Sequence, residues 1–178
     1  MITLVTGGAR SGKSSFAENK YLDLKDVVYI ATSRIWDEEM GERIEHHQKS
    51  RPSEWRTYEG NYNLRDSLGK ERHYLLDCLT VLTSNIMFDI TKDAEYIDYE
   101  LQRKVEDTVI GEISNLIEQI NSKGYDLIIV TNEVGDSIVP DNHVARVFRD
   151  VQGRVNQRIA NLSQKVYLVC CGIPVKIK

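Results

Sequence analysis

A glycine-rich run directly after the first apolar segment constrains this chain more than any other feature. Residues 7–14 read GGARSGKS and fit the pattern G-x-x-x-x-G-K-[ST] in full. Residues 2–6 are apolar and β-branched, which predicts a buried strand, and residues 13–22 predict a helix. A loop between a strand and a helix with this pattern predicts a phosphate-binding loop.

The residue types in this run suit the chemistry of phosphate binding. Small residues let successive backbone N–H groups curl around phosphate oxygens. We expect Lys13 to reach the β- and γ-phosphates of a nucleotide and the Ser14 hydroxyl to ligate Mg²⁺. The alternative is a glycine-rich turn that binds nothing, which the flanking strand and helix disfavour. The predicted nucleotide-binding residues of the loop are Gly7, Gly8, Ala9, Arg10, Ser11, Gly12, Lys13 and Ser14.

Strands and helices are predicted to alternate along the rest of the chain. Continuous apolar runs at 27–31, 73–77, 126–131 and 166–171 predict buried strands. Helices are expected at 37–48, where the helix is polar and partly exposed, and at 78–90, 101–120 and 144–162. Residues 51–70 are expected to be irregular, and 173–178 to form a short tail. This pattern predicts an α/β fold, a mostly parallel sheet covered on both faces, in one catalytic domain spanning residues 1–178.

Charge, hydrophobicity and cysteine content exclude some classes of protein and indicate where in the cell this one is expected. The net charge of −4 does not suit a nucleic-acid-binding protein, which needs a basic face. Apolar stretches are too short to cross a membrane, and the phosphate loop begins too early to leave room for a signal peptide. We therefore expect a cytoplasmic protein. Cys78, Cys170 and Cys171 fit neither a disulfide framework nor a zinc site, and their apolar surroundings predict buried, inert thiols.

Two acidic residues follow predicted strands. Asp77 closes the strand 73–77, where a carboxylate can hold Mg²⁺ or its water shell. Asp77 could equally cap the following helix, and the sequence leaves both interpretations open. Glu133 stands in an equivalent place after 126–131 and could orient a substrate hydroxyl or form a salt bridge.

The adjacent pair His46–His47 has two interpretations. A neutral imidazole can act as a nucleophile toward phosphorus, and the basic residues Arg43, Lys49 and Arg51 nearby suit phosphates. Adjacent side chains on a helix point about 100° apart, so the two histidines do not share one task easily. From these residues alone, an ordinary solvated helix face is the simpler interpretation.

A series of short motifs runs along nearly the whole chain. It begins at TGGARSGKS (6–14) and continues through YIATS (29–33), DEEM (37–40) and RIEHH (43–47). It also includes RP (51–52), WRT (55–57), Glu59, TNEVG (131–135), IVP (138–140), RD (149–150), GRVNQ (153–157) and GIPVKIK (172–178). In this order the motifs resemble one enzyme family, the bifunctional adenosylcobinamide kinase / adenosylcobinamide-phosphate guanylyltransferases (CobU family).

The resemblance implies two reactions of cobalamin biosynthesis. ATP or GTP would phosphorylate the aminopropanol hydroxyl of adenosylcobinamide, and GTP would then donate GMP to that phosphate. It also implies a RecA-like P-loop NTPase sheet, Mg²⁺ and a homotrimer.

Site residues follow from the same resemblance. His46 matches the histidine that becomes a GMP–histidine. The segments matching nucleotide contacts are the loop Gly7 to Ser14, Thr32, Ser33, Arg34, His47, Gln48, Lys49, Ser50, Glu59 and Asp77, with Ser14 and Asp77 as metal ligands.

Two other functions remain possible on the sequence. A different P-loop small-molecule kinase would transfer only the γ-phosphate, with the histidine pair incidental. A non-catalytic nucleotide-binding module would bind GTP without an acceptor. Only the bifunctional enzyme requires His46.

Overall fold

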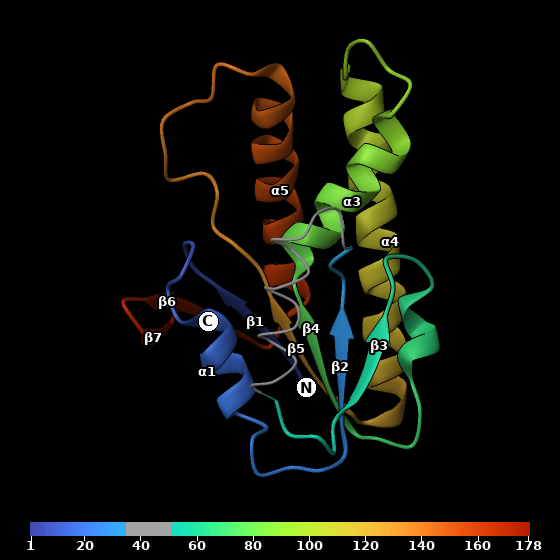
Figure 1. The fold of residues 1–178 in the computed structure, drawn as a ribbon, viewed down its shortest axis with the longest axis vertical. Coiled ribbons are helices and arrows are strands. Elements are labelled where there is room, and N and C mark those ends of the chain that lie inside the picture. Colours follow the sequence, from blue (N-terminus) through green and yellow to red (C-terminus); the bar gives the residue numbers. More distant parts are fainter. Residues whose placement is uncertain (35–50) are drawn as a thin grey trace.

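This computed structural model describes residues 1–34 and 51–178. The described residues are built around one β-sheet. Its seven strands run in the order β3-β2-β4-β5-β1-β6-β7 (Figure 1). Each neighbouring pair is parallel except β6–β7, which is antiparallel. The strands are β1 Ile2–Thr6, β2 Val27–Ala31, β3 Arg56–Glu59, β4 His73–Asp77, β5 Asp126–Val130, β6 Lys165–Cys170 and β7 Ile173–Lys176.

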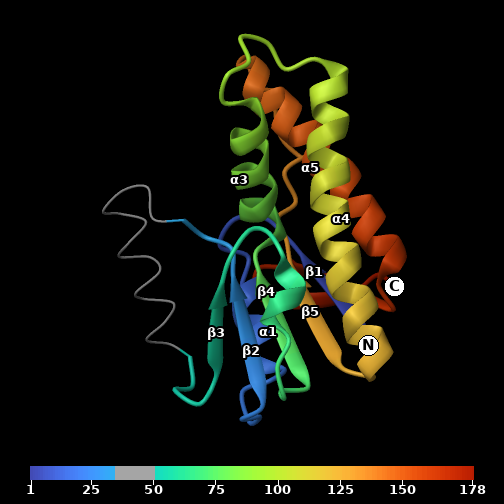
Figure 2. The ribbon, with the colours of Figure 1, turned by 90° about the vertical axis from the view of Figure 1, so that its right-hand side faces the viewer.

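Helices cover both faces of the sheet, as a parallel sheet requires (Figure 2). Helix α1 (Lys13–Asn19) packs through Ala17 on one face with Val5, Tyr29 and Val130. The opposite face carries α3 (Leu79–Thr91), α4 (Tyr99–Lys123), α5 (His143–Leu162) and the 3₁₀ turn η1 (Leu64–Ser67). Alternate residues of one strand therefore enter different cores: Leu75 faces α1, whereas Tyr74 and Leu76 face α3 and α4.

The sheet confirms the predicted mostly parallel α/β fold, with the glycine-rich loop between its first strand and first helix, and most element boundaries agree within two or three residues. Strands β1, β2 and β4 begin and end where their apolar runs do. Helix α4 begins after Asp98, whose carboxylate accepts a hydrogen bond from the Leu101 N–H at 2.8 Å, and ends at Gly124. The helix expected at 37–48 lies outside the described residues.

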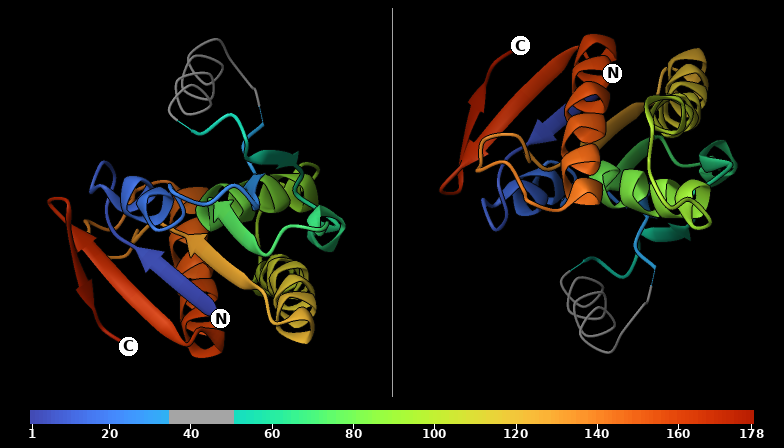
Figure 3. Two further views of the ribbon diagram at one scale, coloured as in Figure 1. Left: turned by 90° about the horizontal axis from the view of Figure 1, so that it is seen from below. Right: turned by 90° about the horizontal axis from the view of Figure 1, so that it is seen from above.

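Two strands lie where the sequence predicted none. Strand β3 lies in the stretch expected to be irregular, and β7 replaces the expected tail. Both are edge strands, as Figure 3 shows for β7. β3 alternates half-buried with exposed residues, and β7 is exposed throughout, so neither has the apolar run that marks an inner strand. Pro174 is tolerated in β7 because an edge strand leaves one row of its backbone unpaired.

The cysteine prediction was correct for one residue and wrong for two. Cys78 is buried at the start of α3, whereas Cys170 and Cys171 are exposed at the β6–β7 turn. The apolar composition of β6 was misleading because this strand has only an edge strand beyond it. Within the described ranges, no helix is long and apolar enough to cross a membrane.

Gly111 within α4 and Gly124 directly after it offer a test of the helix backbone and of where the helix ends. A Cβ at Gly111 would meet nothing within 4 Å, so Gly111→Ala is expected to raise the free energy of unfolding by about 0.5–1 kcal/mol through reduced chain entropy. Gly124 ends the helix at φ 69°, where an alanine side chain is strained, so Gly124→Ala should lower the free energy of unfolding by about 1 kcal/mol. Urea unfolding of both variants checks this, and equal shifts would contradict the helix boundary.

Candidate functional site: a phosphate loop and its acidic neighbours

The glycine-rich run forms a loop at the carboxyl end of β1, where ligands of open parallel sheets bind. It spans Gly7 to Ser14 and leads into α1 at Lys13. Gly8, Ala9 and Arg10 are exposed, while Ser11, Gly12, Lys13 and Ser14 are half-buried. The Lys13 ammonium bends back over the loop and donates to the Gly8 carbonyl at 3.2 Å, so it lies where phosphate oxygens would be held.

Backbone contacts hold this loop from both sides. The Glu133 N–H donates to the Gly7 carbonyl at 3.0 Å, and the Gly172 N–H donates to the Ser11 carbonyl at 2.8 Å. The first contact comes from the end of β5 and the second from the β6–β7 turn. The loop is therefore shaped by segments far from it in sequence.

At two positions of the loop, only glycine avoids a clash with neighbouring backbone. A Cβ at Gly7 would collide with the Val169 carbonyl oxygen. A Cβ at Gly12 would lie 3.1 Å from the Gly172 Cα, and Gly12 also has a φ of 91°, where side chains are strained. At Gly8 nothing lies within 4 Å of an added Cβ.

Asp77 stands beside the loop as the last residue of β4. The Tyr29 hydroxyl donates to its Oδ2 at 3.0 Å and so orients the carboxylate. The cap position of α3 is Cys78, without a side-chain capping bond, so the helix-cap interpretation of Asp77 is wrong. Burial and the Asp77 charge raise the pKa of the Cys78 thiol to about 12, while Lys13 opposes the shift, as expected if both charges lie near this strand end.

The oxygens near the loop suit Mg²⁺. This ion prefers oxygen ligands and is usually held by one or two protein groups together with substrate phosphates and waters. The Ser14 hydroxyl and the Asp77 carboxylate are such groups. Across the described ranges no cluster of three or more His, Cys, Asp or Glu residues could form a self-sufficient metal cage.

Glu18 is a further acid at this site, which the sequence reasoning missed. Its Oε1 is buried without a hydrogen-bond partner. Burial and, secondly, the Asp77 charge raise the pKa of Glu18 to about 7, while Arg51 lowers it. The guanidinium of Arg51 lies over the Tyr29 ring, 3.6 Å from its centroid. The spacing of Ser14 and Glu18, four residues apart on α1, was the available signal.

Thr32 joins two strand ends. Its hydroxyl donates to the Cys78 carbonyl at 2.9 Å and accepts from the Cys78 N–H at 3.0 Å, so this side chain is committed to the backbone. The Asn85 amide donates to the Thr32 carbonyl at 2.8 Å. A nucleotide contact predicted at Thr32 would therefore have to use the neighbouring backbone.

Arg34 is held by α3. Its guanidinium forms two bonds of 2.7 Å with the Asp89 carboxylate, which also accepts from Tyr62. The bonded guanidinium holds the pKa of Asp89 below its usual range. Ser33 is half-buried beside Arg34, and Glu59 is exposed at the end of β3, next to β2. The predicted residues His46, His47, Gln48, Lys49 and Ser50 lie outside the described part of the chain.

A cavity of about 620 Å³ opens beside Arg34. It is lined mainly by apolar surface and can take a large organic group. Its described lining residues are Arg34, Thr80, Val81, Ser84, Asn85, Phe88 and Phe148.

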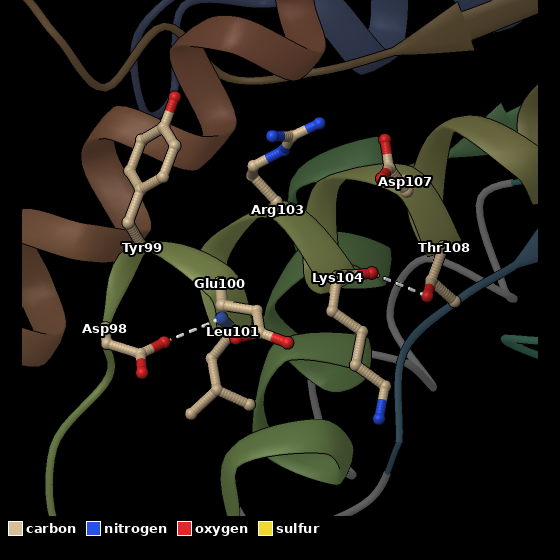
Figure 4. Close-up of a pocket in the computed structure, with 8 residues that line it drawn as sticks. All are labelled: Asp98, Tyr99, Glu100, Leu101, Arg103, Lys104, Asp107 and Thr108. Carbon is tan, nitrogen blue, oxygen red and sulfur yellow. Dashed lines mark hydrogen bonds between the residues drawn. The ribbon is translucent and has the colours of Figure 1, made fainter.

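A larger hollow of about 1090 Å³ lies along the first turns of α4 (Figure 4). Its lining comes from residues 98–108, and Figure 4 shows their side chains spread along one helix rather than converging on one point. Because polar groups do not converge there, we assign the site to the strand ends instead.

Comparison with known proteins decides the family. A family model described as cobinamide kinase / cobinamide phosphate guanyltransferase (CobU) matches residues 3–177. The chain belongs to this family. It is 44% identical over 182 residues to the bifunctional adenosylcobalamin biosynthesis protein CobU of Escherichia coli (strain K12), with 100% of each chain covered.

Two further relatives and one solved structure are also similar to this chain. Identity is 45% over 185 residues to the protein of the same name from Salmonella typhimurium, again with 100% of both chains covered. Identity to the bifunctional protein CobP of Pseudomonas aeruginosa is 35% over 183 residues, covering 100% of this chain and 98% of that one. A KaiC-like protein from Pyrococcus horikoshii OT3 aligns over 94% of this chain and 69% of its own, with 14% identity and a TM-score of 0.44.

The glycine contacts of this CobU-family loop predict an order of stabilities. Gly12→Ala should lower the free energy of unfolding by about 1–3 kcal/mol, because its side chain would be strained at positive φ and crowded by Gly172. Gly8→Ala is the matched control and should change it by less than about 0.5 kcal/mol. Urea unfolding without nucleotide measures both, and equal stability of the two variants would contradict this loop geometry.

Glu18 predicts a pH dependence of stability. Its pKa is raised from 4.5 to about 7 in the folded protein, so the folded state binds more protons than the unfolded state between these values. The contribution of Glu18 to the free energy of unfolding is therefore fully present below pH 4.5, where the carboxyl is neutral in both states. It is lost as the pH rises toward and beyond 7, because the buried carboxyl then has to ionise. Glu18→Gln should flatten this part of the stability profile. Melting temperatures from pH 5 to 8 in chelator test it, and parallel profiles would refute it.

Proposed function

We propose that this chain catalyses both reactions named for its family. A nucleoside triphosphate, ATP or GTP, would phosphorylate the aminopropanol hydroxyl of adenosylcobinamide. GTP would then transfer GMP to that phosphate, giving adenosylcobinamide-GDP and pyrophosphate. The observation that carries this proposal is the phosphate loop Gly7 to Ser14 beside Asp77, in a chain that matches the family over residues 3–177.

In the kinase reaction, positioning and electrostatics supply most of the catalysis. Backbone N–H groups of the loop hold the phosphates, and Lys13, close above the loop, adds a positive charge to the β- and γ-phosphates. Ser14 and Asp77 would hold Mg²⁺, which neutralises phosphate charge when bound. Tyr29 keeps the Asp77 carboxylate in place through its 3.0 Å hydrogen bond.

In the second reaction, His46 would attack the α-phosphorus of GTP as a neutral imidazole and displace pyrophosphate. The phosphate of the acceptor would then displace the histidine. Dividing the transfer into two steps reduces the charge repulsion, because the acceptor phosphate approaches a GMP group that no longer carries the pyrophosphate. Ser33, Arg34, His47, Gln48, Lys49, Ser50 and Glu59, with the backbone at Thr32, are the proposed nucleotide contacts outside the loop.

The assembly and location belong to the same proposal. The family resemblance favours a homotrimer, which light scattering of the purified protein can test, and the composition favours a cytoplasmic location. The apolar cavity beside Arg34 supports the binding of a large organic group near the nucleotide.

The decisive experiment is label transfer from α-labelled GTP. Incubation with Mg²⁺ but without corrinoid should label the chain with an acid-labile, base-stable bond, because a phosphoramidate to histidine has this stability. His46→Ala should abolish the label. His47→Ala is the matched control and should retain it. An unlabelled wild type that still binds GTP would indicate a plain P-loop kinase or a binding module.

A further inference from the structure

Two neighbouring thiols lie at the β6–β7 turn, outside the residues assigned above. Cys170 and Cys171 are both exposed, and their Sγ atoms are 3.8 Å apart. The remaining cysteine, Cys78, is buried, and burial together with Asp77 raises its pKa to about 12. The exposed pair is therefore the accessible thiol group of this chain, and because the adjacent Cys171 thiol raises the pKa of Cys170, its reaction is favoured at alkaline pH.

The turn that carries the pair is tight and partly strained. Cys170 pairs with Ile173 across the antiparallel ladder, so Cys171 and Gly172 form a two-residue connection. Their φ values of 51° and 79° are those of a type I′ turn. Cys171 is one of the few non-glycine residues in the left-handed region here, a conformation that favours glycine or asparagine.

This turn also supports the phosphate loop. The Gly172 N–H donates to the Ser11 carbonyl at 2.8 Å. Gly172 also packs against Gly12, where an added Cβ would lie 3.1 Å from its Cα. A change in the backbone of residues 171–172 must therefore reach Ser11 and Gly12.

We propose that Cys170 and Cys171 form a reversible redox site, in which a disulfide between them withdraws support from the phosphate loop and weakens nucleotide binding. The effect on nucleotide binding rests on the function proposed for residues 7–14. The oxidant is a low-molecular-weight disulfide. One cysteine thiolate attacks a sulfur of this disulfide and releases one small thiol. The second cysteine thiolate then attacks the mixed disulfide and releases the other small thiol, so two cysteine thiols are oxidised and one small disulfide is reduced.

Geometry explains why oxidation must move the turn. Disulfide sulfur atoms lie about 2.0 Å apart, so the two Sγ atoms must approach from 3.8 Å. Adjacent Cα atoms are about 3.8 Å apart, closer than the roughly 4.4–6.8 Å that an unstrained disulfide spans. The ring therefore closes only if the backbone of the turn adjusts. Such a strained and exposed disulfide is also easily reduced, as a reversible site requires.

The test uses the full chain at pH 8 with oxidised glutathione as the small disulfide. Trypsin releases residues 166–176, which contain both exposed cysteines and no other. We expect this peptide to lose two hydrogen masses. The dissociation constant of a fluorescent GTP analogue should rise about fivefold, the equivalent of one lost backbone hydrogen bond. Dithiothreitol should reverse both changes.

Two variants separate the pair from its turn. Cys171→Gly removes one thiol, and glycine suits the positive φ at this position. This variant should bind the GTP analogue as the reduced wild type does, and oxidised glutathione should not change its dissociation constant. The affinity of Cys170→Ser should also be unchanged by oxidised glutathione.

Stable glutathione adducts without an internal disulfide would overturn the proposal, as would a disulfide that leaves affinity unchanged. If the reduced wild type fails to bind GTP, the proposed function fails, whereas the peptide mass still decides whether the thiols pair.

Discussion

The backbone clamp on the phosphate loop is the interaction on which the site depends. Hydrogen bonds from Glu133 and Gly172 hold the carbonyls of Gly7 and Ser11, so the loop is held between the end of β5 and the β6–β7 turn. With these carbonyls engaged from outside, the loop conformation is supported without a bound ligand. Glycines stand at 7 and 12 because the segments around the loop leave no room for side chains there: an added Cβ would meet the Val169 carbonyl oxygen at Gly7 and the Gly172 Cα at Gly12.

A second junction places the acidic side of the site. The Thr32 hydroxyl bonds to both backbone groups of Cys78 and so fixes the end of β2 against the end of β4. Asp77 and Tyr29 are thereby brought into hydrogen-bond contact, with Glu18 near enough for the two acidic charges to interact. A buried carboxyl such as Glu18 is costly to ionise beside another acid. Metal and phosphate charge at this place would change that cost, so its protonation is expected to respond to ligands.

Sequence reasoning succeeded where one residue pattern dominated. The phosphate loop, the inner strands and the position of helix α4 follow from local chemistry, whereas the cap of this helix at Asp98 was not predicted. It failed at β3 and β7, because edge strands lack two buried faces. It failed at Cys170 and Cys171 because an apolar run does not reveal whether a strand lies at the middle or near the edge of a sheet. Glu18 was missed because its burial, and secondly its proximity to Asp77, 59 positions away in the chain, arise only on folding.

Residue order and spacing along the chain are enough to identify the class of fold, the phosphate loop and the family. Only the folded structure reveals that the Thr32 hydroxyl is hydrogen-bonded to the backbone and that Arg34 is bound to Asp89. It also decided that the β6–β7 turn touches Ser11 and Gly12. Burial, hydrogen-bond partners and the pKa of Glu18 arise from groups brought together by the sheet. No local pattern records them, because each depends on the strand order rather than on neighbouring residues.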